Sequence, residues 1–280
     1  MDWLQALILG IIQGLTEFLP VSSSGHLIIG KELLGLQVTD NIAFEIVVHC
    51  ATVLSTITVL RKEIATLFLK LFKLQWNSET QYIGMILLSM IPVMIVGLFF
   101  KKTVENLFGA GLALVGTMLL FTAGLLLLAS LRGVRNTLSK KSGALQKSEI
   151  ENQKNFSWGT AFLMGLAQAV AVLPGLSRSG TTIATGLLVG VKKEEVAKFS
   201  FLMVLIPILG ETLLDALKGE FSTAVTGIPI SSLLVGFVAA YICGCFACKF
   251  MIALVKRANL LWFALYCSIT GIVALIYTLC

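Results

Sequence analysis

The chain has 280 residues, of which 57% are hydrophobic and 13% are charged, and its mean hydropathy is +0.93. These values lie outside the range of soluble globular domains and predict a membrane protein with several spans. Membrane proteins carry an excess of Lys and Arg in their cytoplasmic loops, and this excess explains the formal net charge of +6. We therefore expect the lipid bilayer as a partner and no nucleic acid.

The first 36 residues are apolar but do not form one continuous span. The motif LPVSSSG at 19–25 divides residues 3–36 into two pieces of about three turns each, and each piece is too short to cross roughly 30 Å of hydrocarbon. Pro and Gly break helices and leave backbone N–H groups unpaired, which a membrane tolerates only where protein or water covers them. We therefore predict a re-entrant helical hairpin over residues 3–36.

Three apolar stretches with the length of a spanning helix follow this hairpin, at Ile42–Leu60, Tyr82–Phe100 and Gly111–Leu131. Because lipid cannot satisfy backbone polar groups, these stretches should be helices. Residues 132–157 are rich in Ser, Lys, Gln and Asn, which is typical of a connector outside the membrane.

The second half of the chain has the same order of elements. Residues 158–191 are interrupted by LPGLSRSG at 173–180, which predicts a second re-entrant hairpin. Three more spans follow at Phe199–Leu217, Ile230–Phe250 and Leu260–Leu279. The predicted fold is therefore an all-α integral membrane domain over residues 1–280, with six transmembrane helices and two re-entrant hairpins.

A constant offset of 155 residues aligns the two hairpins. It places Gly10 on Gly165, Gln13 on Gln168, Ser22 on Ser177, Ser24 on Ser179, Gly25 on Gly180 and Phe44 on Phe199. Because three spans separate the hairpins, the repeat 158–280 enters the membrane from the side opposite to the repeat 1–131. We therefore predict an inverted-topology repeat, joined by the connector 132–157.

The distribution of basic residues indicates which side is cytoplasmic. Most loop Lys and Arg fall on one side of the predicted topology: Arg61, Lys62, Lys70, Lys73, Arg132, Arg135, Lys140, Lys141, Lys147, Lys154, Lys192, Lys193, Lys198, Lys249, Lys256 and Arg257. The opposite side keeps Lys31, Lys101, Lys102 and Lys218. By the positive-inside rule the first side is cytoplasmic, and both termini lie outside.

Inverted repeats of this kind place their sites near the bilayer midplane, where the hairpin tips meet. The first tip offers Gln13, Glu17, Ser22, Ser23, Ser24 and His26, and the second offers Ser177, Arg178, Ser179, Thr181 and Thr182. Glu17 and Arg178 are charged groups in apolar surroundings, and such groups are candidates for function because an uncompensated charge there is costly. The alternative is a purely structural ion pair between them.

These residue types suit a phosphate site with a metal ion. Gln13 and Glu17 are four residues apart, so both face the break from one side of a helix and offer oxygen ligands for a hard cation. Ser22–Gly25 and Ser177–Gly180 each open a helix whose free N–H groups attract an anion, and Arg178 is suited to bidentate phosphate contact. Either loop taken alone is explained more simply as an ordinary helix cap.

Two histidines lie near this predicted site. His26 follows Ser22 by four residues and Ser23 by three, close enough to act as base or acid for a hydroxyl, although a lone histidine in an apolar helix is as often a hydrogen-bonded core residue. Glu45 and His49 share one face of the next span and border the same predicted cavity. We favour Glu45 as the supporting residue, since plain packing explains His49 equally well.

The motif QGLTEFLPVSSSGH at 13–26, together with PGLSRSG at 174–180, resembles the motifs of the undecaprenyl-diphosphate phosphatase family, also called BacA or UppP and associated with bacitracin resistance. The resemblance covers the whole chain. It implies a hydrolase of the bacterial cytoplasmic (inner) membrane that removes the terminal phosphate of undecaprenyl diphosphate and so supplies the carrier lipid for peptidoglycan synthesis. It also implies dependence on Mg²⁺ or Ca²⁺ and a site open to the periplasmic or outer face.

Position by position, the resemblance assigns roles to individual residues. The family's acidic pair corresponds to Gln13 and Glu17, its serines to Ser22 and Ser23, its histidine to His26 and its arginine to Arg178. We therefore predict Glu17, Ser23, His26 and Arg178 as catalytic residues and Gln13 and Glu17 as metal ligands. From the chemistry of the two loops we predict the phosphate-binding residues Ser22, Ser24, Gly25, Ser177, Arg178, Ser179 and Thr182. Many family members have Glu where this chain has Gln13. The amide leaves Glu17 as the single anionic ligand at the first tip and predicts weaker metal binding.

The sequence leaves the attacking group open, because Ser23, His26 and a water molecule would all need the same neighbours. The rival function is a polyprenyl-lipid flippase or secondary transporter, since inverted repeats with broken helices are a transporter architecture. The GxxxG patterns at 10–14 and 186–190 fit a homodimer as well as close packing within one chain.

Overall fold

A computed structural model of the chain describes residues 1–36, 42–71, 77–141, 156–217, 227–257 and 259–279. Every regular element in these ranges is a helix, which confirms the all-α class. The helices are α1 (Trp3–Thr16), α2 (Ser23–Leu33), α3 (Ile42–Val59), α4 (Arg61–Leu71), α5 (Ser78–Phe99), α6 (Lys101–Phe108), α7 (Leu112–Lys141), α9 (Trp158–Val170), α10 (Arg178–Leu188), α11 (Lys193–Met203), α12 (Leu205–Leu217), α14 (Ile230–Arg257) and α15 (Leu261–Tyr277). Residues 142–155 of the predicted connector, and the loop residues Lys73 and Lys218, lie outside the described residues.

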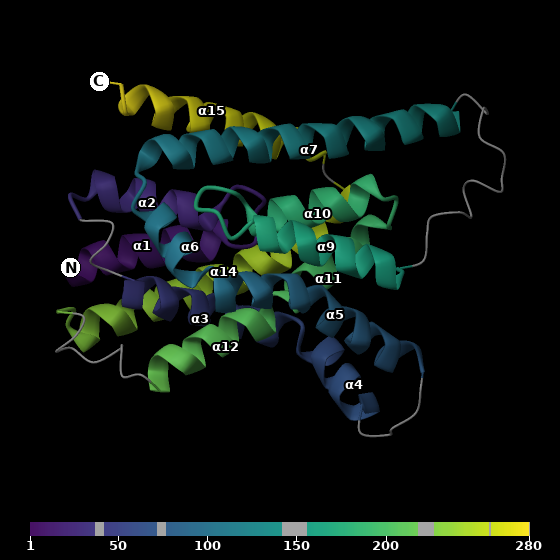
Figure 1. The fold of residues 1–280 in the computed structure, drawn as a ribbon, viewed down its shortest axis with the longest axis horizontal. Coiled ribbons are helices and arrows are strands. Elements are labelled where there is room, and N and C mark those ends of the chain that lie inside the picture. Colours follow the sequence, from purple (N-terminus) through teal and green to yellow (C-terminus); the bar gives the residue numbers. More distant parts are fainter. Residues whose placement is uncertain (37–41, 72–76, 142–155, 218–226, 258, 280) are drawn as a thin grey trace.

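Each predicted hairpin is a pair of short helices separated by an irregular turn. Helices α1 and α2 flank residues 17–22, and α9 and α10 flank residues 171–177, so both breaks overlap the motifs that predicted them. Asp2 begins α1 with a capping box, and the Ser157 hydroxyl caps the start of α9. The two helix pairs occupy the middle of the bundle (Figure 1).

Three helices are long and apolar enough to span a membrane: α5, the Leu112–Arg132 part of α7 and the Ile230–Val255 part of α14. A fourth is obtained if α3 and α4, which are bent by 78° at a short break, are taken as one broken span. Helix α15 is apolar but has 17 residues. The described residues therefore hold three or four candidate spans by length and composition, and the count of six stays a prediction.

The predicted span Phe199–Leu217 is not one continuous helix. Helix α11 begins earlier, at Lys193, and ends at Met203, and α12 begins at Leu205. Pro207 supplies the physical reason, because it has no N–H for the Met203 carbonyl and its ring clashes with that carbonyl in a continuous helix. Hydropathy alone carries no information about this break.

Glycines allow the hairpins to approach the long helices closely. Helix α1 packs on α14, where a Cβ on Gly10 would lie 2.4 Å from the Gly236 carbonyl oxygen. Helix α9 packs on α5, where a Cβ on Gly165 would lie 2.2 Å from the Ser89 carbonyl oxygen. Helix α15 lies along α7 (Figure 1). Each hairpin therefore packs against a long helix from the other half of the chain, at contacts that only glycine permits.

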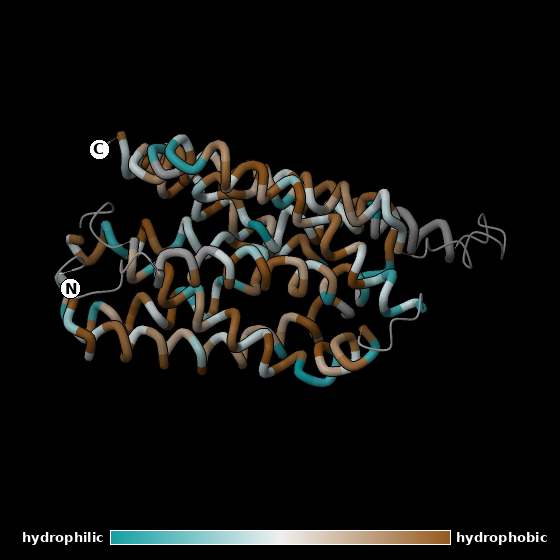
Figure 2. Tube along the Cα trace, turned by 60° about the horizontal axis from the view of Figure 1, so that its bottom comes forward, coloured by the Kyte–Doolittle hydropathy of each residue, from teal (hydrophilic) through white to brown (hydrophobic). Residues whose placement is uncertain are grey.

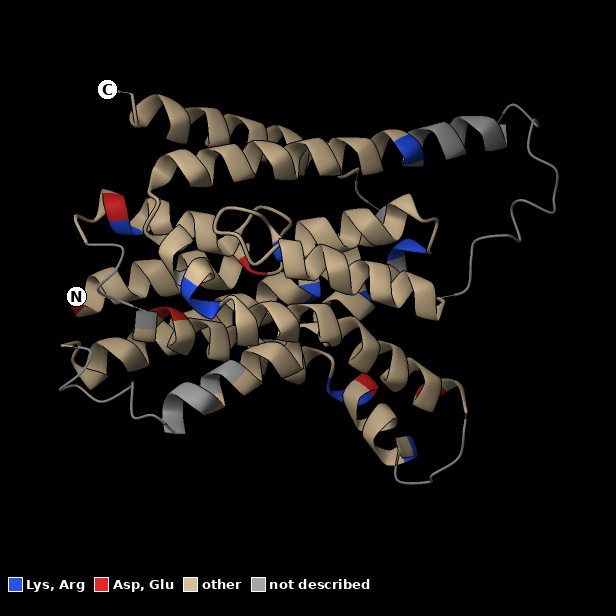
Figure 3. Cartoon of the chain, viewed as in Figure 1, with Lys and Arg blue, Asp and Glu red and all other residues tan. Residues whose placement is uncertain are grey.

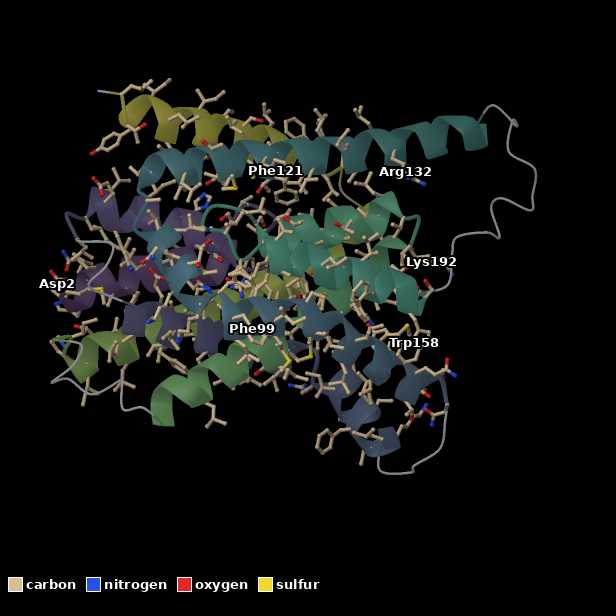
Figure 4. All side chains as sticks on the ribbon, in the orientation of Figure 1. Asp2, Phe99, Phe121, Arg132, Trp158 and Lys192 are labelled. Atoms are coloured by element: carbon tan, nitrogen blue, oxygen red, sulfur yellow. The ribbon has the colours of Figure 1, made fainter. Side chains whose placement is uncertain are left out.

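The outer surface of the bundle is apolar. Phe99 is 77% exposed and Phe121 is 55% exposed, and hydrophobic residues run along most of the helices (Figure 2). Charged residues are sparse on the ribbon (Figure 3). Arg132 and Lys192 lie toward one end of the long axis, and Asp2 lies at the other (Figure 4). Large exposed apolar side chains in such number are characteristic of a protein solvated by lipid.

Candidate active site

The tips of the two hairpins are in direct contact. The Ser179 hydroxyl donates to the Leu19 carbonyl oxygen at 3.1 Å, and the Gly175 N–H donates to the Ser24 hydroxyl at 3.4 Å. These bonds join segments about 150 residues apart in the sequence. They bring the polar residues of both tips to one place inside an otherwise apolar bundle.

Each tip ends in a serine that caps the following helix. Ser22 Oγ accepts the Gly25 N–H at 3.2 Å, and Ser177 Oγ accepts the Gly180 N–H at 3.0 Å. Ser22 has a φ of +69°, a left-handed conformation that costs a non-glycine residue about 1–3 kcal/mol. Such strain persists only where the surroundings determine the backbone, and it is concentrated at functional sites.

The Glu17 carboxylate is the centre of the polar cluster between the tips. Its side chain is 10% exposed, and it accepts hydrogen bonds from Gln13 Nε2 at 2.8 Å and from Ser23 Oγ at 2.5 Å. Arg178 Nη2 lies 3.2 Å from Glu17 Oε1, and His49 Nε2 lies 3.6 Å from Glu17 Oε2. One buried carboxylate thus joins residues of both hairpins and of α3.

Arg178 forms the ion pair with Glu17 that the sequence offered as a purely structural alternative. This pair occupies only one of the hydrogen-bond donors of the guanidinium. A guanidinium carries five N–H groups, and a single bond to Glu17 leaves donors for a further anion. The side chain is 28% exposed and lines a cavity together with Glu17. The remaining polar lining of this cavity comes from Thr52, Thr56, Gln168, Ser179, Thr182 and Ser200.

The serine and threonine residues predicted to bind phosphate differ in how free their side chains are. Ser22 and Ser177 are occupied as caps, and Thr182 Oγ1 lies 2.6 Å from Ser200 Oγ. The Ser24 hydroxyl accepts a hydrogen bond from Gly175 of the second tip, and the Ser179 hydroxyl donates one to Leu19 of the first tip. Their main contribution is therefore to order two helix N-termini whose free N–H groups can meet an anion.

His26 is not joined to the Glu17 cluster by any contact among the described residues. Its Nδ1 lies 2.7 Å from the Ser22 carbonyl oxygen, and its Nε2 lies 2.8 Å from the hydroxyl of Tyr266 on α15. The Ser23 hydroxyl donates to Glu17 instead. The expected histidine–serine pair is thus replaced by a carboxylate–serine pair, which no helical spacing indicates because Glu17 and Ser23 lie on either side of the break.

Glu45 was favoured as the supporting residue of the site, but His49 is the one of the two that lies beside Glu17. Glu45 forms a salt bridge of 2.5 Å with Lys31, which is fully buried although it was expected in an outer loop. The His49 Nδ1–H donates to the Glu45 carbonyl oxygen at 2.8 Å, and this bond turns Nε2 toward Glu17. His49 is therefore the site residue that sequence reasoning undervalued, and its spacing of four from Glu45 was the available signal.

The cluster contains one feature that fits a divalent cation. Gln13 Oε1 is buried and has no hydrogen-bond partner, and it belongs to the residue that also donates to Glu17. An amide oxygen beside a carboxylate suits Mg²⁺ or Ca²⁺ if water or phosphate oxygens supply the other ligands. Within the described ranges, no group of three or more His, Cys, Asp and Glu side chains forms a complete metal site.

Comparison with known proteins places the chain in a family. A family model described as "Bacitracin resistance protein BacA" matches residues 6–273. The chain belongs to the BacA family. Every residue of the cluster, from Gln13 to Arg178, lies within the part that the BacA model matches.

Several BacA relatives have been named for an activity. A protein of Parabacteroides distasonis is 56% identical over 280 residues, which cover 100% of this chain and 99% of the relative, and one of Bacteroides fragilis is 55% identical over 277 residues, which cover 99% and 98%. A more distant relative from Methanobrevibacter smithii is 38% identical over 287 residues, covering 98% and 96%. All three carry the name undecaprenyl-diphosphatase.

Proposed function

We propose that the chain hydrolyses undecaprenyl diphosphate to undecaprenyl phosphate and inorganic phosphate. Membership of the BacA family and nearly full-length relatives named undecaprenyl-diphosphatase support this function. The observation that carries the mechanism is the Glu17 carboxylate, which contacts Ser23 of one tip and Arg178 of the other. A potential nucleophile, a base and a phosphate-binding cation thereby share one buried site.

Ser23 is the nucleophile that this geometry favours over His26 and water. Its hydroxyl already donates to Glu17, so the carboxylate can take the proton as Ser23 Oγ attacks the terminal phosphorus. The bond between that phosphorus and the bridging oxygen breaks, and undecaprenyl phosphate leaves with the electron pair. Glu17 then gives this proton to the departing undecaprenyl phosphate or to solvent. In the second step the Glu17 carboxylate takes a proton from the attacking water, the bond between phosphorus and Ser23 Oγ breaks, and Glu17 returns the proton to Ser23 Oγ as inorganic phosphate leaves.

Arg178 and the two helix N-termini neutralise the charge that the phosphoryl group carries during transfer. Phosphoryl transfer depends mainly on positioning and on stabilising the non-bridging oxygens, so these groups supply most of what the reaction needs. Arg178 already lies across the site from Ser23, held by the carboxylate that both residues contact. The diphosphate competes with Glu17 for the guanidinium as it binds.

Gln13 and Glu17 would hold a divalent cation, Mg²⁺ or Ca²⁺. The buried Gln13 Oε1 without a partner supports this assignment. When bound, the cation would add positive charge beside the phosphate oxygens. The amide at position 13 in place of a second carboxylate reduces the negative charge of the site, so metal binding is expected to be weak.

The membrane arrangement belongs to the same proposal: six spans and two re-entrant hairpins form an inverted repeat in the bacterial inner membrane. Both termini lie at one end of the long axis, and Arg132 and Lys192 lie toward the other, which fits cytoplasmic basic loops and outer termini (Figures 1 and 4). The packing of each hairpin on a long helix of the opposite half supports the repeat. The site would open toward the outer face.

Trapping the covalent intermediate tests the mechanism. Purified protein in detergent is mixed with substrate labelled in the terminal phosphate, quenched within milliseconds under acidic and alkaline conditions, digested and mapped by mass spectrometry. We expect label on Ser23 and none in Ser23→Ala. Label on His26 would replace the nucleophile, and turnover without any labelled protein would favour water. Lipid transfer without phosphate release would instead support the flippase or transporter.

A further inference from the structure

Both ring nitrogens of His26 are engaged, and their partners differ in chemistry. The Ser22 carbonyl oxygen facing Nδ1 can only accept, so Nδ1 must carry a hydrogen. In the neutral ring Nε2 is then the only nitrogen with a free lone pair, and it faces the Tyr266 hydroxyl at 2.8 Å. The phenol can donate to the neutral ring and accept from the protonated one.

Tyr266 reaches His26 from the far end of the chain. The two residues are 240 positions apart, and their rings are nearly parallel, with an interplanar angle of 10°. The next residue on α15, Cys267, directs Sγ toward the Pro20 carbonyl oxygen of the first tip at 3.5 Å. Two adjacent residues of α15 thus lie against the first hairpin, immediately beside its break.

The ring of Tyr266 is not part of the hydrophobic core. It is 46% exposed, on the apolar outer surface of the bundle, where a tyrosine hydroxyl has no packing function. Its hydroxyl is nevertheless bonded to a polar partner, the imidazole of His26. A phenylalanine would satisfy the packing equally well and would suit a lipid-facing position better.

We propose that Tyr266 is a positioning residue for His26, which holds the imidazole by Nε2 while Ser22 holds it by Nδ1. With both ends bonded, the ring plane and the tautomer are fixed, and the Nε2 lone pair points in one direction. If the phenol oxygen is removed, the imidazole of His26 is held only by its hydrogen bond to the Ser22 carbonyl oxygen and can change its orientation. The contact itself is independent of the proposed function, but its effect on rate rests on that function.

Chemical modification tests the contact without using activity. Diethyl pyrocarbonate acylates unprotonated imidazole nitrogens, and the chain has two histidines, so each can be followed by mass spectrometry of its own peptide. We expect His26 in Tyr266→Phe to react at least about threefold faster than in the unaltered protein. His49, whose Nε2 faces Glu17, is the internal reference. An unchanged ratio of His26 to His49 modification would overturn the proposal.

Tyr277→Phe is the matched control, because Tyr277 lies on the same helix and is similarly exposed at 55%. It should leave both histidines and the rate unchanged. Hydrolysis by Tyr266→Phe should show kcat lowered roughly tenfold with KM nearly constant, since His26 bonds to the Ser22 carbonyl oxygen in the turn that sets Ser23 against Glu17, and a looser turn misplaces the Ser23 hydroxyl in the bound state. Faster modification with an unaltered kcat would remove the positioning role. Absence of hydrolysis in all three proteins would instead reject the proposed function and leave the modification result standing.

Discussion

The Ser23 hydroxyl and the Glu17 carboxylate lie 2.5 Å apart although a helix break separates them in the sequence. In a continuous helix, residues six apart point in different directions, because each residue turns the chain by about 100°. The break at Pro20 and the left-handed backbone of Ser22 fold the second helix start back over the end of the first. The strained turn is therefore what makes a base and a hydroxyl into neighbours.

Glu17→Gln tests the carboxylate as base. The amide keeps the size of the side chain but cannot take the Ser23 proton, so kcat should fall by about 100-fold or more. Phosphate release from undecaprenyl diphosphate in detergent measures it. Glu32→Gln, at an exposed position near the end of α2, is the matched control and should retain the full rate. A rate close to that of the unaltered protein for Glu17→Gln would exclude Glu17 as the base.

Arg178→Lys tests whether the geometry of the guanidinium matters in addition to its charge. Lysine keeps the charge but loses the planar fork that grips two phosphate oxygens, so we expect kcat/KM to fall by roughly 10- to 100-fold. Steady-state kinetics separate the effects on kcat and KM. Arg132→Lys, at an exposed position on α7, should have no effect. Equal kinetics for both variants would mean that Arg178 acts as a point charge only.

Much of the fold could be predicted because broken apolar segments have a direct physical meaning. The Pro, Gly and Ser at the centres of residues 3–36 and 158–191 predicted a break in each segment, and both segments form helix pairs whose breaks overlap those motifs. The break between α11 and α12 was missed for a different reason. Hydropathy averaged over a window does not register Pro207, which ends a helix without making the segment polar.

The contacts within the site were less predictable, because they depend on segments that are distant in the sequence. Spacing suggested that His26 would serve Ser23, but the chain direction after Ser22 turns the hydroxyl to Glu17 and the imidazole to Tyr266, 240 residues away. Lys31 was assigned to the outer side from the predicted order of spans alone. Only the folded structure shows that its ammonium is buried and paired with Glu45 of α3.

Gly165→Ala tests the close approach of α9 to α5. The added methyl group would lie 2.2 Å from the backbone oxygen of Ser89, which cannot move without shifting α5, so the free energy of unfolding should fall by about 1–3 kcal/mol. Thermal unfolding in detergent measures the change. Gly159→Ala on the same helix meets nothing within 4 Å and should be neutral or slightly stabilising. Equal stability of the two variants would show that the helices separate easily.

The Lys31–Glu45 salt bridge joins the end of α2 to the start of α3. Single and double substitutions can separate the attraction between the two charges from the packing of the two side chains. Lys31 is fully buried, and Glu45 is 14% exposed, so Lys31→Met leaves the Glu45 carboxylate with little water to replace the lost contact, and Glu45→Gln removes an anionic partner of the buried ammonium. We expect Lys31→Met to lower the free energy of unfolding by roughly 3 kcal/mol, and Glu45→Gln to do so by a similar amount. Unfolding by a denaturing detergent measures both.

The double variant distinguishes an electrostatic pair from two independent packing contacts. If the cost of each single change comes from the loss of attraction between the two charges, Lys31→Met with Glu45→Gln should be clearly more stable than the sum of the single losses predicts, because neither charge remains. Additive losses would mean that the two side chains contribute by packing alone. Since the Glu45 carbonyl oxygen orients His49 toward Glu17, the double variant should also retain hydrolysis if the backbone of α3 stays in place.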